Sequence, residues 1–320
     1  MRDVSRALFL IVVCAILTSG CGNAKAKSVP HAQRWGIYEL NLATQEVKLM
    51  YGSAGEIATS TLGLNSQGDT LVFAQKIDGD SNERAEICTI GVDGKNFKRV
   101  TNNSSWDLYP VWSPDGKRIA FLSLRRADFD IYVMDADGRN ERRLFDSGSH
   151  DADIHWSARK IVFTAKSQVW MIGEDGTPPV RITNPPKAGQ WGKANLPFGD
   201  YDPRLSPDGK RIVFERLEGD TSPHGNYNIY VVNADGSGAT RLTDTGYSQG
   251  LASWSHSSAQ IVYTVAAIRD QGKYDLYMMN ADGTQNRSVT PSYFPDAFLC
   301  HAAIFSKDDS RIFFIGEWWE

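Results

Sequence analysis

The chain has 320 residues and a formal net charge of −4, and 22% of its residues are charged. Non-specific binding to nucleic acids needs a basic field that neutralises phosphates, so this charge argues against a nucleic-acid partner. Proteins and small molecules remain open as partners at this point.

The first 20 residues have the pattern of an export signal. Arg2 and Arg6 precede an apolar run over residues 7–17, which is too short to span a bilayer. The run ends in the sequence LTSGC, whose small residues before Cys21 resemble a bacterial lipobox. We therefore expect Cys21 to be the lipidated first residue of the mature chain, which would hold the protein on a membrane surface. An ordinary cleavable signal with a chance cysteine is the alternative.

Gly22 follows Cys21, at a position where some sorted lipoproteins have Asp. By resemblance to those lipoproteins, the absence of Asp favours the periplasmic side of the outer membrane if the source is Gram-negative. Residues 21–34 are polar and contain one proline, so they predict a tether. We expect Cys88 in a strand and Cys300 in a loop between repeats, without a disulfide between them.

Residues 112–138 (WSPDGKRIAFLSLRRADFDIYVMDADG) form the clearest unit of a repeat. The runs Arg118–Ser123 and Asp130–Met134 are rich in β-branched and aromatic residues and predict two strands with one buried face. The SPDG sequence at residues 113–116 predicts a tight turn before the first strand, because Pro presets φ and Gly accepts a positive φ.

Copies of this unit fill the rest of the mature chain. The positions equivalent to Ser113 are residues 65, 113, 157, 206, 255 and 306, which lie 48, 44, 49, 49 and 51 residues apart. A period of this length with about four strands is typical of a propeller blade. The sequence therefore predicts an all-β fold, a six-bladed β-propeller over residues 35–320.

The repeat also resembles a known family. Its motifs are SPDGK-I-F, then IYV-(D/N)ADG, then R-x-T, seen for example at Arg241-Leu242-Thr243. Together they resemble the β-propeller repeat of the TolB family. This resemblance implies the fold but not a function, because similar repeats occur in periplasmic scaffolds, peptidase propellers and sugar-acid lyases. It also implies an α/β domain before the propeller of TolB itself, for which we expect no counterpart here.

The two ends of the chain supply different halves of one unit. The strand predicted at Trp35–Asn41 is of the IYV type, whereas residues 302–318 have the first two strands of a unit. We therefore expect a composite closing blade formed by both chain ends, which hides the edges of the ring. Trp318 and Trp319 are expected to pack inside that blade.

Several catalytic and metal-binding patterns do not fit this fold. Residues 246–250 (GYSQG) match a nucleophile motif that needs a strand-to-helix elbow, but here the segment joins two strands. The ADG turns lack the other ligands of a calcium loop. The histidines show no metal-ligand spacing, although His150, His155 and His301 fall near equivalent places in the repeat.

One group of acidic residues has a repeated position. The residue six places before the Ser113 position is Asp in three repeats, and the residue four places before it is Asp in two of them and Tyr109 in the third. We expect these side chains to ring one mouth of the central channel. The five aspartates are Asp107, Asp151, Asp153, Asp200 and Asp202. Crowded carboxylates favour a cation or a basic partner. The alternative is that these residues only cap turns.

The longest connection between blades is the other candidate contact site. Residues 184–197 (NPPKAGQWGKANLP) are expected to expose Trp191 and Lys193, either for a partner or as idle surface.

These patterns favour a monomeric, lipid-anchored, non-catalytic module that binds an envelope protein or peptide. No cofactor is expected apart from a calcium ion in the channel. The competing hypothesis is a metal-assisted lyase or hydrolase that acts on an acidic sugar or peptide with His150, His155 or His301 and the same aspartates. A third hypothesis is that the protein is a spacer that only displays loops.

Overall fold

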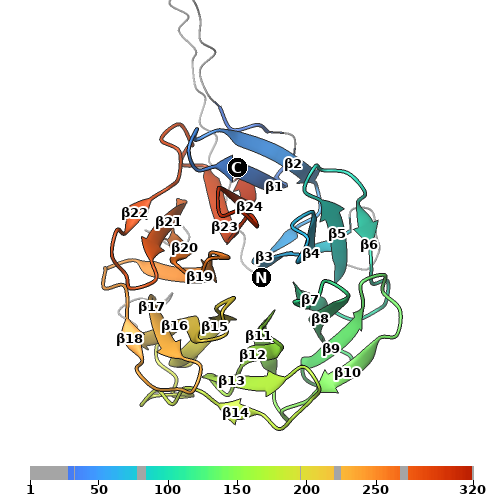
Figure 1. The fold of residues 1–320 in the computed structure, drawn as a ribbon, viewed down its shortest axis with the longest axis vertical. Helices are drawn as coiled ribbons and strands as arrows, with labels where there is room; N and C mark the ends of the chain where they lie inside the picture. Colours follow the sequence, from blue (N-terminus) through green and yellow to red (C-terminus); the bar gives the residue numbers. More distant parts are fainter. Residues whose placement is uncertain are drawn as a thin grey trace, which may run out of the picture.

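The computed structural model describes residues 28–31, 33–77, 84–194, 196–219, 225–266 and 273–318. These residues form six four-stranded antiparallel sheets arranged around a central channel (Figure 1). The predicted all-β six-bladed propeller is therefore confirmed. The predicted signal, Cys21 and Trp319 lie outside the described residues. Within the described part of the chain, no helix has the length and apolar character needed to cross a membrane.

Five blades are each built from consecutive strands, with the first strand of each at the channel (Figure 1). The first three of these blades are β3 (Ile57–Leu64), β4 (Thr70–Lys76), β5 (Ala85–Gly91) and β6 (Lys98–Arg99); β7 (Asp107–Trp112), β8 (Arg118–Ser123), β9 (Asp130–Asp135) and β10 (Arg142–Phe145); and β11 (Asp151–Ser157), β12 (Lys160–Ala165), β13 (Gln168–Gly173) and β14 (Val180–Arg181). The next two are β15 (Gly199–Leu205), β16 (Arg211–Gly219), β17 (Asn226–Asn233) and β18 (Thr240–Arg241); and β19 (Ser248–Trp254), β20 (Gln260–Ala266), β21 (Tyr274–Asn280) and β22 (Arg287–Ser288).

The sixth blade joins the two ends of the chain, as predicted. It contains β23 (Phe298–Phe305), β24 (Arg311–Trp318), β1 (Trp35–Asn41) and β2 (Val47–Ser53), in that order from the channel outwards. β1 pairs with β24 in continuous register, from Trp35 opposite Glu317 to Asn41 opposite Arg311. This pairing closes the ring and leaves no open blade edge between the two ends.

Residues before β1 add to the closure. Val29 is buried in the apolar cluster of the closing blade, and the His31 ring lies 4.3 Å from the Trp318 ring. Arg34 binds Glu317 at 2.8 Å, and its carbonyl accepts a hydrogen bond from the amide of Trp318. The described end of the predicted tether is thus packed against the blade, as Trp318 was expected to be.

The SPDG motif owes its recurrence to a hydrogen-bonded turn. Ser113 Oγ donates to Asp115 Oδ1 (2.6 Å) and accepts from the amide of Arg118 (2.9 Å), which locks the turn before β8. Ser206 and Ser306 make the same pair of bonds in their blades. The side chain satisfies backbone groups that the turn would otherwise leave unpaired.

The threonine of the R-x-T motif also has a repeated role. In three blades, and at the equivalent Thr290 of a fourth whose sequence is Ser288-Val289-Thr290, the hydroxyl accepts a hydrogen bond from an amide of the third strand, fourteen residues earlier in the chain. The four pairs are Thr101 with Ile87, Thr183 with Val169, Thr243 with Ile229, and Thr290 with Leu276. The motif therefore ties the outer strand of a blade to the middle of its sheet.

The core lies between neighbouring blades. One cluster packs Val72 and Ile87 of one blade against Trp112, Ile119 and Phe121 of the next. Cys88 and Cys300 are free and buried. The expectation that Cys300 lies in a loop was wrong: it is part of the inner strand β23, because the pairing with β24 begins two residues earlier, at Phe298.

Candidate functional site: the two mouths of the central channel

The inner strands share a break that aims side chains into the channel. In five of them the pairing with the second strand slips, and one non-glycine residue near the slip has a positive φ. These residues are Tyr109 (51°), Asp153 (53°), Asp202 (47°), Leu251 (54°) and Ala302 (42°). Such a bulge bends the strand and redirects its side chains. Four of the five residues, all except Ala302, line the cavity described next.

A cavity of about 300 Å³ lies where the inner strands begin, and we call it the acidic mouth. Its carboxylates are Asp153, Asp202 and Glu215, and Tyr109 and His301 also line it. The backbone amide of Asp202 donates to Asp153 Oδ2 at 3.2 Å. Burial, together with the nearby charge of Asp202, raises the pKa of Asp153 to about 7. The mouth therefore gains negative charge across neutral pH.

The five aspartates predicted to ring this mouth are separated by the structure. Asp153 and Asp202 line the acidic mouth, whereas Asp107, Asp151 and Asp200 are fully buried inside their blades and do not line it. The reason is the bulge, since residues before it face the second strand of their own sheet: Asp107 lies opposite Ser123, and Asp200 opposite Arg216.

Two of the buried aspartates have strong partners. Asp107 accepts hydrogen bonds from Ser123 (2.5 Å) and Asn103 (2.7 Å) and has Arg125 at 3.6 Å. Burial nevertheless raises the pKa of Asp107. Asp200 accepts two bonds from Arg216, at 2.6 and 2.9 Å. These carboxylates stabilise their own blades. Their hydrogen bonds come mainly from side chains, whereas the turn-capping alternative predicted bonds from backbone amides.

Asp151 occupies the same position in its blade but lacks the cross-strand partner. It lies opposite Ala165, where the neighbouring blades have Ser123 and Arg216. Burial raises the pKa of Asp151 to about 7. This blade thus contains a buried carboxylate that is protonated below neutral pH.

The long connection predicted as a contact site reaches the acidic mouth. The amide of Gly189 donates to the carbonyl of Phe198, and the amide of Phe198 donates to the carbonyl of Gln190, so the connection folds back as a hairpin. Trp191 is 69% exposed and Lys193 lies in the same exposed stretch. Leu196, also exposed, lines the acidic mouth.

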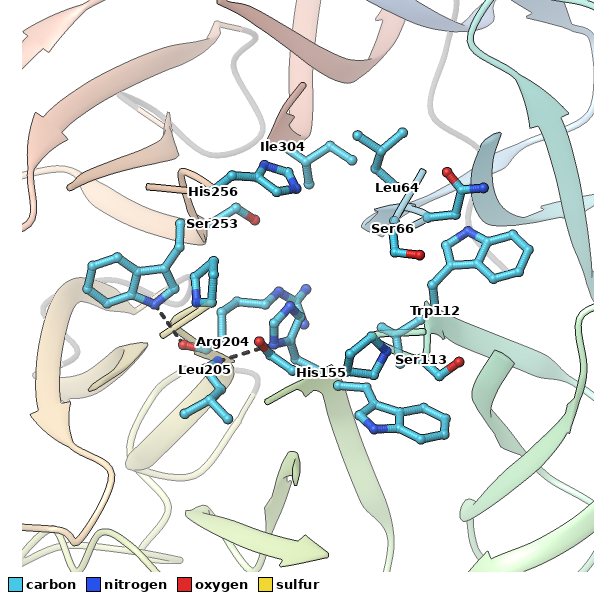
Figure 2. A pocket seen from close by; sticks show the side chains of 18 of the residues that line it. Leu64, Ser66, Trp112, Ser113, His155, Arg204, Leu205, Ser253, His256 and Ile304 are labelled. Carbon is cyan, nitrogen blue, oxygen red and sulfur yellow. Dashed lines mark hydrogen bonds between the residues drawn. The ribbon is translucent and has the colours of Figure 1, made fainter. Parts of the chain in front are cut away.

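A second cavity, of about 400 Å³, lies where the inner strands end, and we call it the tryptophan mouth (Figure 2). Trp112, Trp156 and Trp254 are among its lining residues, but only 9%, 4% and 7% of their surfaces are exposed, because they pack in the apolar clusters between the blades. His155 and Arg204 also line the cavity. The amide of Leu205 donates to His155 Nδ1 at 3.2 Å (Figure 2). Burial, aided by the Arg204 charge, lowers the pKa of His155 to about 3, so its imidazole is neutral.

Arg204 separates the two mouths. It extends from β15 and donates to the carbonyl of Ile154 on the neighbouring blade (3.1 Å) and to that of Ser60 on the opposite side of the ring (3.3 Å). Its Nη2 lies 3.6 Å from Asp202 Oδ1. The channel is therefore acidic on one side of Arg204 and free of carboxylates in its described lining on the other.

The three histidines of the competing hypothesis do not converge. His150 is in an exposed loop beside Asp128, His155 lies in the tryptophan mouth, and His301 binds Glu317 at 3.5 Å at the acidic mouth. No group of three or more His, Cys, Asp or Glu side chains with metal-binding geometry occurs in the described segments. The GYSQG segment joins strands β18 and β19 without a helix, as expected, but only Gly246 and Tyr247 are in the loop, because Ser248–Gly250 already belong to the inner strand β19.

Sequence reasoning missed Glu215 and Arg204. A signal was present, because Glu215 stands where the other blades have Leu122, Thr164 and Thr264. Its carboxylate packs on the backbone of Gly250, where an added Cβ would lie 2.1 Å from Glu215 Oε2. Arg204 stands where another repeat has Val111. In both cases the clue was a charged residue at a position of the repeat that is uncharged in the other blades.

Comparison with known proteins agrees with this architecture. A family model described as TolB beta propeller domain matches residues 31–173. An uncharacterized protein of Agrobacterium fabrum is 29% identical over 243 residues, which cover 71% of this chain and 77% of that protein. A TolB homolog of Chlorobium luteolum is 26% identical over 179 residues (54% and 36% of the two chains), and the Tol-Pal system protein TolB of Desulfosudis oleivorans is 28% identical over 120 residues (36% and 26%). The matches thus span about a third or less of the TolB relatives.

Solved structures show the same fold. A protein assigned as TolB from Agrobacterium tumefaciens superposes with a TM-score of 0.67 and 17% identity, over 90% of this chain and 99% of that one. An oligogalacturonate lyase in complex with manganese superposes with a TM-score of 0.55 and 14% identity, over 89% and 83% of the two chains. At these identities the likeness concerns the fold alone.

The fold and its repeat define a six-bladed β-propeller closed by a composite blade. The matching family model, over residues 31–173, and the TolB relatives show that this propeller is similar to those of TolB proteins.

Proposed function

We propose that this chain is a non-catalytic lipoprotein of the bacterial cell envelope whose acidic mouth binds a protein or peptide partner. The TolB relatives support a protein-binding role at the periplasmic side of the envelope. The single observation that carries the proposal is the acidic mouth itself: Asp153, Asp202 and Glu215 gather beside the exposed loop that contains Trp191.

The chemistry of this mouth suits a basic partner with an apolar flank. Clustered carboxylates attract a cationic segment and orient it during encounter. An exposed tryptophan at the edge of such a site supplies apolar contact area, which often dominates binding energy. Leu196 continues the apolar surface from the loop into the mouth. A partner that presents Lys or Arg next to an apolar side chain would use both parts.

The proposed anchor places this mouth near a membrane. Lipidation at Cys21 would leave residues 22–34 between the lipid and β1, and the described part of that stretch packs on the closing blade. The propeller would therefore stay close to the bilayer surface, at the outer membrane if the source is Gram-negative.

The test is capture of envelope proteins by the full chain in mild detergent, with chemical cross-linking and quantitative mass spectrometry. The Asp153→Asn and Asp202→Asn double variant should capture at least about tenfold less of the partner. The reason is that it lacks two carboxylates that would pair with the partner's cationic side chains in a partly desolvated site. The matched control is the Asp137→Asn and Asp175→Asn double variant, which removes two exposed charges from outer turns. Equal capture by both double variants would overturn the proposal.

A further inference from the structure

The tryptophan mouth lies at the opposite end of the channel from the proposed protein-binding site. Its volume of about 400 Å³ lies within the range of small-molecule sites, which are mostly apolar with a few converging polar groups. Trp112 and Trp254 are the last residues of β7 and β19, and Trp156 is the last but one of β11, so all three line the cavity at the same level. Pro114 and Pro207 of the SPDG turns add rigid apolar surface at the rim.

Two of the three tryptophans, Trp156 and Trp254, are held in fixed positions by polar contacts. Trp254 Nε1 donates to the carbonyl of Arg204 at 2.9 Å. The guanidinium of Arg118 lies 4.8 Å from the Trp156 ring, and that of Arg211 lies 4.8 Å from the Trp254 ring. These cation–π contacts fix the rings without occupying the cavity, since neither arginine is among its lining residues. The site is therefore preorganised, which reduces the entropic cost of binding.

The polar groups at the base of the cavity include two donors. Arg204, with only 7% of its surface exposed, carries a permanent positive charge into the channel (Figure 2). His155 Nδ1 accepts the amide of Leu205, so the proton of its neutral ring is on Nε2, which can donate. Ser253 adds a hydroxyl to the wall.

No carboxylate opposes these donors within the described lining of the tryptophan mouth. Asp309, near His256 at the rim, accepts hydrogen bonds from the amides of His256 (2.7 Å) and Ser257 (3.0 Å). Among the described residues, the one anion within 4 Å of Arg204 is Asp202, at 3.6 Å and on the side of the acidic mouth. The two shorter contacts of Arg204 go to neutral carbonyls. A buried guanidinium in this state favours a further anion.

We propose that the tryptophan mouth binds a small organic acid, with its carboxylate at Arg204 and His155 and its apolar body against the apolar lining, which includes Leu64, Val111 and Ile304. The donors select a carboxylate over an amine, and the walls select an aromatic or branched aliphatic body. The volume of about 400 Å³ limits the ligand to a low-molecular-weight compound.

The test uses the full chain and isothermal titration calorimetry with the N-acetyl derivatives of phenylalanine, tyrosine, tryptophan and leucine. Each acid is paired with its C-terminal amide, which differs only in the carboxylate. At least one acid should bind with a Kd below about 1 mM, and its amide should bind at least about tenfold more weakly. Failure of all four acids to bind, or equal binding of acid and amide, would refute the proposal.

Two variants place the site. Arg204→Gln removes the charge and should abolish the preference for the acid. Because Arg204 also bridges two blades, Ser253→Asp provides an independent test: it adds a carboxylate to the wall and should reduce acid binding at least about tenfold. Ser253→Asn, which has the same shape as the Asp variant without its charge, should weaken acid binding less than Ser253→Asp does. Undiminished acid binding by a folded Ser253→Asp variant would contradict the assignment.

Discussion

Arg204 Nη2 lies 3.6 Å from Asp202 Oδ1, and this contact is the boundary between the two halves of the channel. Asp202 lines the acidic mouth, while Arg204 lines the tryptophan mouth. Asp202 and Arg204 are two positions apart in β15, and they give one end of the channel a negative charge and the other a positive charge. A symmetric repeat has in this way produced an asymmetric pair of sites.

The raised pKa values of Asp151 and Asp153 predict that the protein is less stable at pH 8 than at pH 5. An unfolded Asp loses its proton near pH 3.9, whereas these buried groups keep theirs until about pH 7. Between these values the folded state binds more protons, so the free energy of unfolding falls as pH rises, by an amount on the order of a few kcal/mol. Asp153→Asn should reduce the difference between pH 5 and pH 8 in chemical denaturation. The exposed Asp137→Asn should keep the wild-type difference, and a similar curve for both variants would count against this account.

The missing cross-strand partner of Asp151 can be supplied. Ala165→Ser places a hydroxyl where Ser123 serves Asp107 at 2.5 Å. A hydrogen bond to the ionised carboxylate should lower the pKa of Asp151 and raise the free energy of unfolding at pH 8 by about 1 kcal/mol. The same change in an Asp151→Asn background should gain less, and a double-mutant cycle measures the difference. Equal effects in the two backgrounds would mean that the serine acts through something other than Asp151.

The threonine of the R-x-T motif should contribute measurably to stability. Thr243 Oγ1 accepts from the buried amide of Ile229 (2.9 Å) and donates to Gln249 (3.0 Å). Thr243→Val leaves that amide unsatisfied and should lower the free energy of unfolding by about 1–3 kcal/mol. Thr240→Val, on the exposed strand of the same blade, is the control and should change it by less than about 0.5 kcal/mol. Urea denaturation compares them.

Lipidation at Cys21 has a direct assay. Cells that express the full chain should incorporate radiolabelled palmitate into the protein, and Cys21→Ser should abolish the label and release the protein from the membrane fraction. The Cys14→Ser variant, altered within the predicted signal, should be labelled like the wild type. A labelled Cys21→Ser variant, or an unlabelled wild type, would remove the anchor from the proposed function.

The fold could be predicted from sequence because it is repeated. The Ser113 turn and the Thr243 contact occur in several blades, so each copy supports the alignment of the others. The composite blade followed from the order of strand types at the two chain ends. The position of Cys300 was missed because the start of an inner strand has no motif of its own.

The candidate site was only partly predictable, for two physical reasons. Spacing alone placed Asp107 and Asp153 on one ring. In each blade, however, a bulge follows the position of Asp107 and includes that of Asp153, so Asp107 faces the sheet and Asp153 faces the channel. The pattern of apolar and polar residues does not reveal such a bulge. Arg204 acts across the ring on Ser60, and a contact between blades on opposite sides depends on the closed ring rather than on any local sequence.

The acidic mouth as a protein-binding site is tested most directly by site-specific photo-cross-linking in living cells. A photo-reactive benzoylphenylalanine is placed at position 191, in the exposed loop whose Leu196 lines the acidic mouth, or at position 180, where Val180 is 58% exposed on the outer strand β14 of a neighbouring blade. The account predicts a discrete adduct from position 191 that disappears when Asp153 and Asp202 are changed to Asn, and none from position 180. Adducts of equal yield from both positions, or an adduct at 191 that survives the loss of both carboxylates, would contradict it.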